Sequence, residues 1–293
     1  MIKFDVNKLS FDQQGKFNDV YEHLKYDYTD YIDYKLNKLK LPHSSENYRS
    51  TDDYLQDEEN EWKFMICRYL RAHKWNIDDT LKAIRHTIQW RIENNVDRIL
   101  FDMPQSQIDL ARQHVPYGIH GFTQQHNPIY IEKTGKIKLD KCLERFSLDE
   151  IVQGHIYTLE MNCRRAREKS RECGKYIETI VTIMDLEGLE IMAGRQAVPI
   201  LRQFMYIDNN HYPERMGLLF ALNTPFFFPI IWGLCKNFID PVTAGKIFIL
   251  KKDEQTKILL QYIDQDQLPR EYQGTCQICS TLLDCIPVYE LKE

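Results

Sequence analysis

The stretch that most constrains the fold is MGLLFALNTPFFFPIIWGLC, residues 216–235, which carries no charge in a chain that is 28% charged overall. A mostly apolar stretch of this length is long enough to cross a bilayer as a helix. An Asn-Thr-Pro triplet interrupts it, however, and Pro229 follows, so backbone hydrogen bonds that a spanning helix needs would be lost. The stretch instead predicts a strand over residues 217–222, a turn, and a short helix beginning at Pro229.

Composition sets limits on the class of protein. A chain of 293 residues with 43% hydrophobic content can bury a large core, and we expect one main domain plus a smaller one. The N-terminal residues lack the apolar run of a secretory signal, and eight scattered cysteines then suggest reduced thiols in the cytoplasm. The net charge of −5 argues against nonspecific nucleic-acid binding. We expect a cytoplasmic monomer with no nucleic-acid partner.

Hydrophobic spacing predicts a helical first hundred residues and an alternating remainder. Helical spacing marks residues 10–40 as one or two helices, residues 43–60 read as a polar linker, and Asn76 suits the start of another helix at Ile77. Beyond residue 110, predicted strands alternate with predicted helices, the strands covering 128–135, 177–184, 217–222 and 246–250 and the helices covering 147–174, 191–208 and 229–238. Such alternation is typical of an α/β fold with a largely parallel sheet.

Motifs for conventional catalysis are missing from the sequence. It contains no G-x-G-x-x-G, Walker loop or H-E-x-x-H, so we expect no enzymatic activity and no cofactor. Cys276 and Cys279, with Cys285 beyond, resemble half of a zinc site, but no second pair stands at the usual spacing, and free thiols are the simpler interpretation. A basic stripe over residues 164–171 is most simply a solvated helix face.

Strand order places two charged residues. If the strands beginning near Gly217 and Lys246 run parallel, Glu214 and Lys246 belong to the same end of the sheet, and the phenylalanines 226–228 to the other. Taken alone, such an acid and base are more often a structural ion pair than a binding site. Three consecutive aromatic residues cannot all face one core, because successive side chains diverge. At least one is therefore expected to face a cavity or an apolar partner.

Several motifs closely resemble the Sec14-like phosphatidylinositol transfer proteins, which carry a CRAL-TRIO lipid-binding domain. They are RYLRAHKWNIDDTLKAI, TIMDLEG, HYPERMG, NTPFFF and FIDPVTAGKIFIL, in family order between about residues 60 and 275. The resemblance implies a helical N-terminal lobe over residues 1–105, a CRAL-TRIO lobe over 106–280 whose sheet floors a pocket for one phospholipid, and a tail over 281–293.

The resemblance also implies roles for individual residues. It assigns the phosphoinositide headgroup site to Lys74, Glu214, Thr243 and Lys246, with His73 where the family usually has arginine. A second-lipid site for phosphatidylcholine matches Tyr130 and Thr182, but Ile180 replaces an expected serine. Ammonium groups suit a phosphate, and a carboxylate suits inositol hydroxyls. Pro199 and Gln273 are further departures from the family pattern.

The residues after NTPF match a gate helix that swings at a membrane to admit and release lipid. The gate residues are Phe226, Phe227, Phe228, Ile231 and Trp232. Three hypotheses follow: a phosphatidylinositol transfer or presentation protein, with phosphatidylcholine or another second lipid and a lipid kinase as client; a carrier of one other hydrophobic ligand such as a sterol; and an unrelated α/β enzyme, which has the least support. The first implies transient association with membranes.

Overall fold

A computed structural model of the chain describes residues 3–38, 51–235 and 241–277. Contacts divide the chain into two compact units. The first comprises Met1–Asp102, Ser170–Tyr176 and Asp208–Glu214. The second comprises Met103–Lys169, Ile177–Ile207 and Arg215–Glu293.

The first unit is helical, as predicted. Its elements are η1 (Val6–Lys8), α1 (Phe11–His23), α2 (Lys25–Asp33), a π-helical segment (Tyr34–Lys38), α3 (Thr51–Ala72), α4 (Ile77–Glu93), η3 (Val96–Arg98) and α5 (Ile99–Asp102). Ser10 and Gln13 form a capping box at α1, and Asn76 caps α4 by accepting a hydrogen bond from Asp79 N. Ile66, Leu70 and Ile84 are fully buried in the core that α1, α3 and α4 share.

The predicted linker over residues 43–60 is wrong for its second half, because α3 already begins at Thr51; residues 43–50 lie outside the described part. Two acids of this segment are buried and paired with cations. Asp57 pairs with Arg171 at 2.6 Å, and Glu58 pairs with Lys35. Buried charges are tolerated when they are paired. A polar composition here marks internal ion pairs and not a loop.

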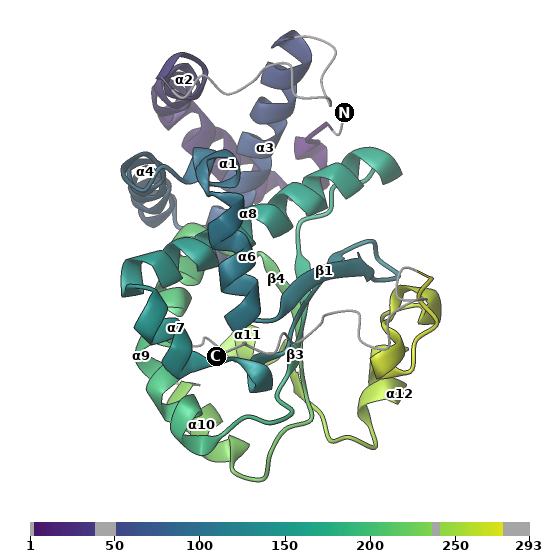
Figure 1. Ribbon diagram of the computed structural model, residues 1–293. Coiled ribbons are helices and arrows are strands. Elements are labelled where there is room, and N and C mark those ends of the chain that lie inside the picture. The colour runs from purple at the N-terminus through teal and green to yellow at the C-terminus, as the bar shows by residue number, and fades with distance from the viewer. Residues whose placement is uncertain (1–2, 39–50, 236–240, 278–293) are drawn as a thin grey trace. The chain divides into compact units, whose positions relative to one another are not determined.

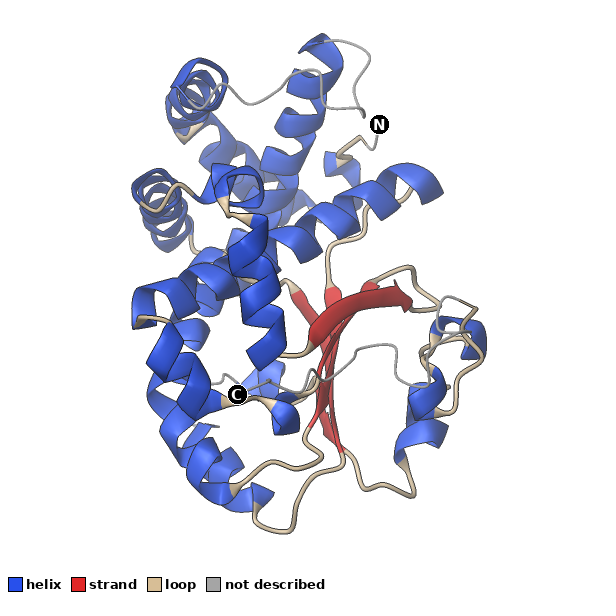
Figure 2. Ribbon diagram, viewed as in Figure 1, coloured by secondary structure: helices blue, strands red, loops and turns tan. Residues whose placement is uncertain are grey.

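The second unit is built on a five-stranded sheet in the order β1-β2-β3-β4-β5. Its strands are β1 (Tyr117–Phe122), β2 (Pro128–Glu132), β3 (Ile180–Asp185), β4 (Met216–Leu222) and β5 (Ile247–Ile249). Only β1 is antiparallel to its neighbour, whereas β2, β3, β4 and β5 run parallel. The predicted largely parallel sheet is confirmed. Figures 1 and 2 show the sheet with α9 and α10 on one side and α12 on the other.

The helices of the second unit precede β1, connect the strands or follow β5. They are α6 (Gln105–His114), η4 (Thr134–Lys136), α7 (Leu139–Arg145), α8 (Leu148–Cys173), α9 (Ile191–His211), α10 (Phe228–Cys235), α11 (Pro241–Ala244), α12 (Gln255–Leu259), η6 (Gln265–Gln267) and η7 (Arg270–Tyr272). The predicted capping box at Ser147 is confirmed, since Glu150 N and Ser147 Oγ lie 3.2 Å apart. The helix predicted over 229–238 is α10, and residues 236–238 lie outside the described part. No helix in the described part has the length and apolarity to cross a bilayer.

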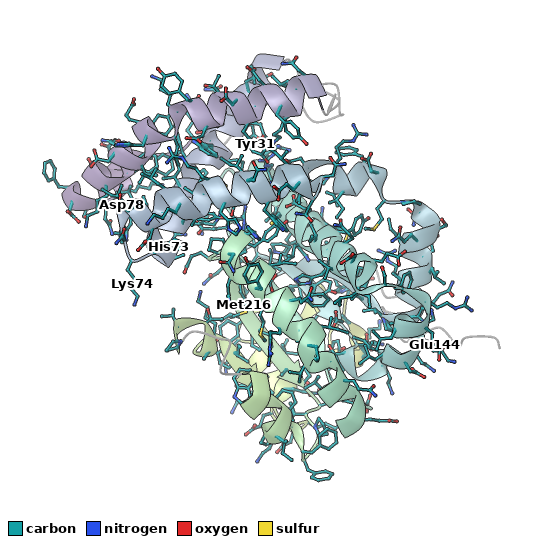
Figure 3. All side chains as sticks on the ribbon, turned by 90° about the vertical axis from the view of Figure 1, so that its left-hand side faces the viewer. Tyr31, His73, Lys74, Asp78, Glu144 and Met216 are labelled. Carbon is teal, nitrogen blue, oxygen red and sulfur yellow. The ribbon has the colours of Figure 1, made fainter. Side chains whose placement is uncertain are left out.

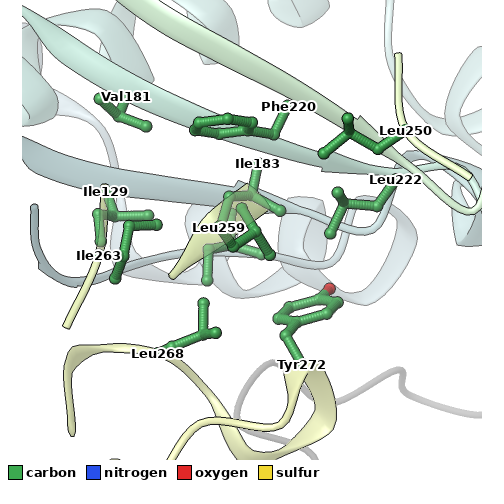
Figure 4. Close-up of a cluster of buried hydrophobic side chains, with 11 residues drawn as sticks. Ile129, Val181, Ile183, Phe220, Leu222, Leu250, Leu259, Ile263, Leu268 and Tyr272 are labelled. Carbon is green, nitrogen blue, oxygen red and sulfur yellow. The ribbon is translucent and has the colours of Figure 1, made fainter. Parts of the chain in front are cut away.

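One face of the sheet is sealed by a hydrophobic core. Alternate residues of β2, β3 and β4 point into it, and segments after β5 close it from the other side. Its buried members, most of them labelled in Figure 4, are Ile129, Ile131, Val181, Ile183, Phe220, Leu222, Leu250, Leu259, Ile263, Leu268 and Tyr272. We call this side the sealed face, and the opposite side the open face.

Candidate functional site

The open face carries a row of partly exposed side chains across the sheet. The strand register places Tyr130 beside Thr182, Thr182 beside Leu219, and Leu219 beside Ile247. Each of these four is half-buried, whereas their neighbours on the sealed face, such as Ile131 and Ile183, are fully buried. Successive side chains of a strand point to opposite faces, so the row belongs to the open face. The side chains of this row are therefore the candidate contacts of a ligand on this face.

The predicted second-lipid residues lie on this open face. The Tyr130 hydroxyl donates to Glu132 Oε2 at 3.0 Å, and burial together with the Glu132 charge holds its pKa well above the ordinary value. Ile180 stands two residues before Thr182 in β3 and is 7% exposed. Among the described residues, none makes a recorded hydrogen bond to the Thr182 hydroxyl, which leaves it open to a ligand.

Glu132 is a polar residue of the open face that sequence reasoning missed. Its carboxylate also accepts a hydrogen bond from Thr134 Oγ1 at 2.8 Å, so it is held from two directions. The signal was present, since Glu132 follows Tyr130 by two residues in a strand. The charge adds an acceptor beside the row, and a fixed carboxylate favours a cationic or hydroxyl-bearing ligand group.

Helix α10, the predicted gate, packs on the same face of the sheet. Phe228 is buried, and with Trp232 it joins a cluster that contains Ala221, Leu219 and Met184. Phe226, by contrast, is 95% exposed, which agrees with the expectation that the three phenylalanines do not share one core. The Phe227 ring lies edge-on to it, with centroids 5.4 Å apart. The side chain of Ile231 lies outside the described part.

Lys246 and Thr243 are joined through the backbone at the start of β5. Lys246 N donates to Thr243 O at 3.0 Å, and Leu219 N donates to Lys246 O at 3.0 Å. The Lys246 ammonium donates to Met216 O at 3.3 Å. No carboxylate of the described residues lies within ion-pair distance of this ammonium. A half-buried ammonium held only by a carbonyl retains donors for an anionic ligand.

His73 and Lys74 lie in the turn between α3 and α4 of the first unit, where Figure 3 shows Lys74 directed outward. Lys74 is exposed and His73 half-buried. Glu214, in the same unit, forms an ion pair with Arg71 at 3.9 Å. Burial lowers the pKa of Arg71, and Glu214 opposes that shift. The carboxylate of Glu214 is therefore already compensated by a cation of its own unit.

Lys74 and Glu214 share an unusual backbone conformation. Both adopt the left-handed region, with φ of 53° and 61°. Non-glycine residues in this region are uncommon and store strain, which the surrounding structure must compensate. Strained residues of this kind concentrate at functional sites, and Lys74 and Glu214 are two of the seven non-glycine residues with positive φ in the described part of the chain.

The remaining candidates from the sequence are the cysteines near the C-terminus and the basic stripe on α8. Among the described residues, no cluster of three His, Cys, Asp or Glu side chains could hold a metal. Cys276 is buried, and Cys279 and Cys285 lie outside the described part. In the basic stripe on α8, Arg164 pairs with Glu168, and Arg165 and Lys169 both flank the ring of Phe122. Three cations of the stripe therefore already contact side chains of their own unit.

Comparison with known proteins identifies the family. Residues 112–274 match the CRAL/TRIO domain. The chain belongs to this family. It is 32% identical over 214 residues to the SEC14 cytosolic factor of Kluyveromyces lactis, a match that covers 73% of this chain and 71% of that protein. The Sec14 cytosolic factor of Schizosaccharomyces pombe is 32% identical over 213 residues, covering 72% of this chain and 74% of that protein.

Two further comparisons bear on function and fold. The phosphatidylinositol/phosphatidylcholine transfer protein SFH7 of Arabidopsis thaliana is 31% identical over 227 residues, covering 77% of this chain but only 41% of that relative. The crystal structure of Sfh5 superimposes with a TM-score of 0.67 at 17% identity, covering 92% of this chain and 90% of that one. This last likeness shows the fold alone. The family match and the identities to the two Sec14 cytosolic factors confirm the resemblance to Sec14-like proteins.

Proposed function

We propose that this chain is a phosphatidylinositol transfer or presentation protein that holds one phospholipid on the open face and exchanges it at membranes. The observation that carries the proposal is the contrast between a sealed face and an open face covered by an uncharged helix, in a chain whose relatives are named for phosphatidylinositol and phosphatidylcholine transfer. An apolar floor with a few fixed polar groups is the usual composition of a small-molecule site.

Roles for the headgroup residues follow from their chemistry. Lys246, with Thr243 beside it, offers ammonium and hydroxyl donors to a phosphate. Lys74, His73 and Glu214 keep the roles that the family motifs give them. Tyr130 and Thr182 supply hydroxyls for a second lipid.

Energetics explain why a gate is needed. Burying ~30 methylene groups at ~0.8 kcal/mol each gives on the order of 25 kcal/mol of gross hydrophobic free energy, so a bound lipid hardly escapes into water. Exchange must then take place on a membrane. The exposed Phe226 is suited to meet the bilayer, while Phe228 and Trp232 cover the acyl chains in solution.

The same proposal covers the setting of the protein. It acts as a cytoplasmic monomer that associates with membranes transiently, without enzymatic activity and without a cofactor other than the bound lipid. Presentation of phosphatidylinositol to a lipid kinase is the client role that fits. None of the motifs of conventional enzymes is present in the sequence.

A second candidate, a carrier of one other hydrophobic ligand such as a sterol, is favoured by Ile180. Its hydrocarbon side chain stands on the open face where the family pattern has a hydroxyl. One experiment separates the two candidates: native mass spectrometry of the purified protein, combined with transfer of labelled phosphatidylinositol between vesicles. Bound phosphatidylinositol with measurable transfer supports the first candidate. A different bound ligand and no transfer support the second.

A further inference from the structure

Asp185 makes an unusual set of contacts at the carboxyl end of β3. It is 7% exposed, and its carboxylate accepts hydrogen bonds from three separate segments. Glu187 N donates to Oδ1 at 3.0 Å, Asn223 Nδ2 donates to Oδ1 at 2.8 Å, and the Tyr272 hydroxyl donates to Oδ2 at 2.9 Å. A buried carboxylate with three donors is strongly anchored, because hydrogen bonds to charged groups are among the stronger ones.

Asn223 stands at the base of the gate. It is the first residue after β4, and the gate residues follow directly. Its backbone lies in the left-handed region with φ of 51°, which asparagine tolerates better than most residues. The side-chain bond to Asp185 therefore fixes the direction in which the chain leaves the sheet. Beyond it, Phe228 and Trp232 hold the gate to the sheet through apolar contacts.

Tyr272 ties the same carboxylate to the sealed face. Its ring is 2% exposed in the core of that face, and Figure 4 shows it beside Leu222 with the hydroxyl turned toward the sheet. The chain turns sharply directly after it. Gln273 has φ of 64°, and a Cβ on Gly274 would lie 1.8 Å from Leu268 O. Tyr272 is thus held in place by backbone that cannot shift easily.

Two kinds of contact hold the gate, apolar packing and a directional hydrogen bond. Apolar packing of Phe228 and Trp232 is not directional, so it opposes lifting of the gate without fixing its base. The Asp185 bond to Asn223 is directional and connects that base to the rigid core through Tyr272. We propose that Asp185 is a positioning residue for lipid exchange, which acts through Asn223 to set how often α10 leaves the open face. The inference rests on the proposed function only in taking α10 as the gate.

The test measures side-chain access in the gate itself. Hydroxyl-radical labelling followed by mass spectrometry reports Trp232 of the gate and Met184 of β3, which belong to one cluster between gate and sheet, while Trp90 in the first unit serves as internal reference. The variant Tyr272→Phe removes one hydroxyl and keeps the ring. We expect the population of detached gate to rise by about tenfold, the size expected for one hydrogen bond to a charged group. Labelling of Trp232 and Met184 then increases while that of Trp90 does not.

Tyr21→Phe is the matched control, because it removes a tyrosine–carboxylate bond of 3.1 Å, to Glu59, in the first unit. It should leave Trp232 labelling unchanged. Wild-type labelling of Trp232 in Tyr272→Phe, in a protein that melts normally, would overturn the proposal. A rise in labelling at Trp90 and Trp232 alike would also overturn it, since that result indicates general loosening of the fold.

A double-mutant cycle tests whether Asp185 acts through Asn223. Asn223→Gly removes the side-chain bond and keeps a residue that adopts φ of 51° without strain. Asp185→Ala should increase Trp232 labelling more than the near-isosteric Asp185→Asn does. Combined with Asn223→Gly, Asp185→Ala should add little, because both remove the same link. Fully additive effects would contradict action through Asn223.

A vesicle assay for transfer of labelled phosphatidylinositol distinguishes failure of this inference from failure of the proposed function. If wild-type protein transfers lipid but Trp232 labelling does not respond to Tyr272→Phe or Asn223→Gly, the positioning role is wrong and the function stands. If the labelling responds but wild-type protein transfers no lipid, the positioning role stands and the proposed function is wrong. If both hold, Tyr272→Phe should also change the transfer rate.

Discussion

The two faces of the sheet differ in how deeply their side chains are buried. On the sealed face, Ile131, Ile183 and Phe220 are fully buried against segments that follow β5. On the open face, Tyr130, Thr182 and Leu219 are half-buried, and the exposed Phe226 lies just before the covering helix α10. Close packing makes the sealed face sensitive to any loss of volume, whereas substitutions among the half-buried side chains of the open face disturb less packing. Alternate residues of the same strands therefore differ in how much they contribute to stability.

The largest expected effect contrasts two neighbours in β3. Ile183→Ala removes buried hydrocarbon from the sealed face and should lower the free energy of unfolding by about 2–5 kcal/mol. Thr182→Ala, on the open face, should lower it by less than about 1 kcal/mol. Urea unfolding of both variants measures the difference. Equal losses would mean that the open face is also part of the rigid core.

The same alternation explains how much of this arrangement the sequence predicts. Residues 216–235 predict β4, the turn and α10 because their lack of charge and their prolines act locally. Ile180 and Thr182 are assigned to one face by alternation alone. Strand β1 was missed because Gly118 and Gly121 weaken its strand signal. Contacts between segments that are distant in sequence cannot be predicted from such local patterns.

The candidate site shows the same limit. Strand order assigned Lys246 to the start of β5, which requires only a parallel crossover. The pairing of Glu214 with Arg71 depends on how α3 folds against the segment after α9, and no local pattern encodes that. The buried acids at the start of α3 were misread for the same reason. Their cationic partners, Lys35 and Arg171, are distant in sequence.

The next effect in size concerns Lys246, which directly precedes β5. Lys246→Ala should reduce phosphatidylinositol transfer by about tenfold or more, because a hydrogen bond to a charged phosphate is worth about 1.5–3 kcal/mol. Stability should change little, since this ammonium contacts only a carbonyl among the described residues. Lys252→Ala is the matched control, on an exposed lysine beyond β5. Reduced transfer by both variants, or a large drop in melting temperature for Lys246→Ala, would argue against a headgroup role.

A smaller effect is expected within the open face. Ile180→Ser restores a hydroxyl two residues from Thr182 and should increase phosphatidylcholine transfer by about tenfold if it completes a hydrogen bond to a phosphate. Phosphatidylinositol transfer should stay nearly constant, because its proposed headgroup contacts involve other residues. Parallel vesicle assays with the two labelled lipids measure the ratio. An unchanged ratio would indicate that Ile180 is structural, in keeping with its burial.

The smallest effect belongs to the sealed face and comes from backbone strain. Gln273 follows Tyr272 with φ of 64°, where a glycine pays no steric cost. Gln273→Gly relieves that strain but also gives the unfolded chain more freedom, which opposes the gain. We expect a net stabilisation of about 0.5–1 kcal/mol in urea unfolding, since the left-handed region costs a residue with a Cβ about 1–2 kcal/mol. Lipid transfer should not respond, because Gln273→Gly leaves Tyr272 and its hydrogen bond to Asp185 in place. If transfer does respond while stability does not, the backbone of this turn acts on the gate as well as the Tyr272 hydroxyl.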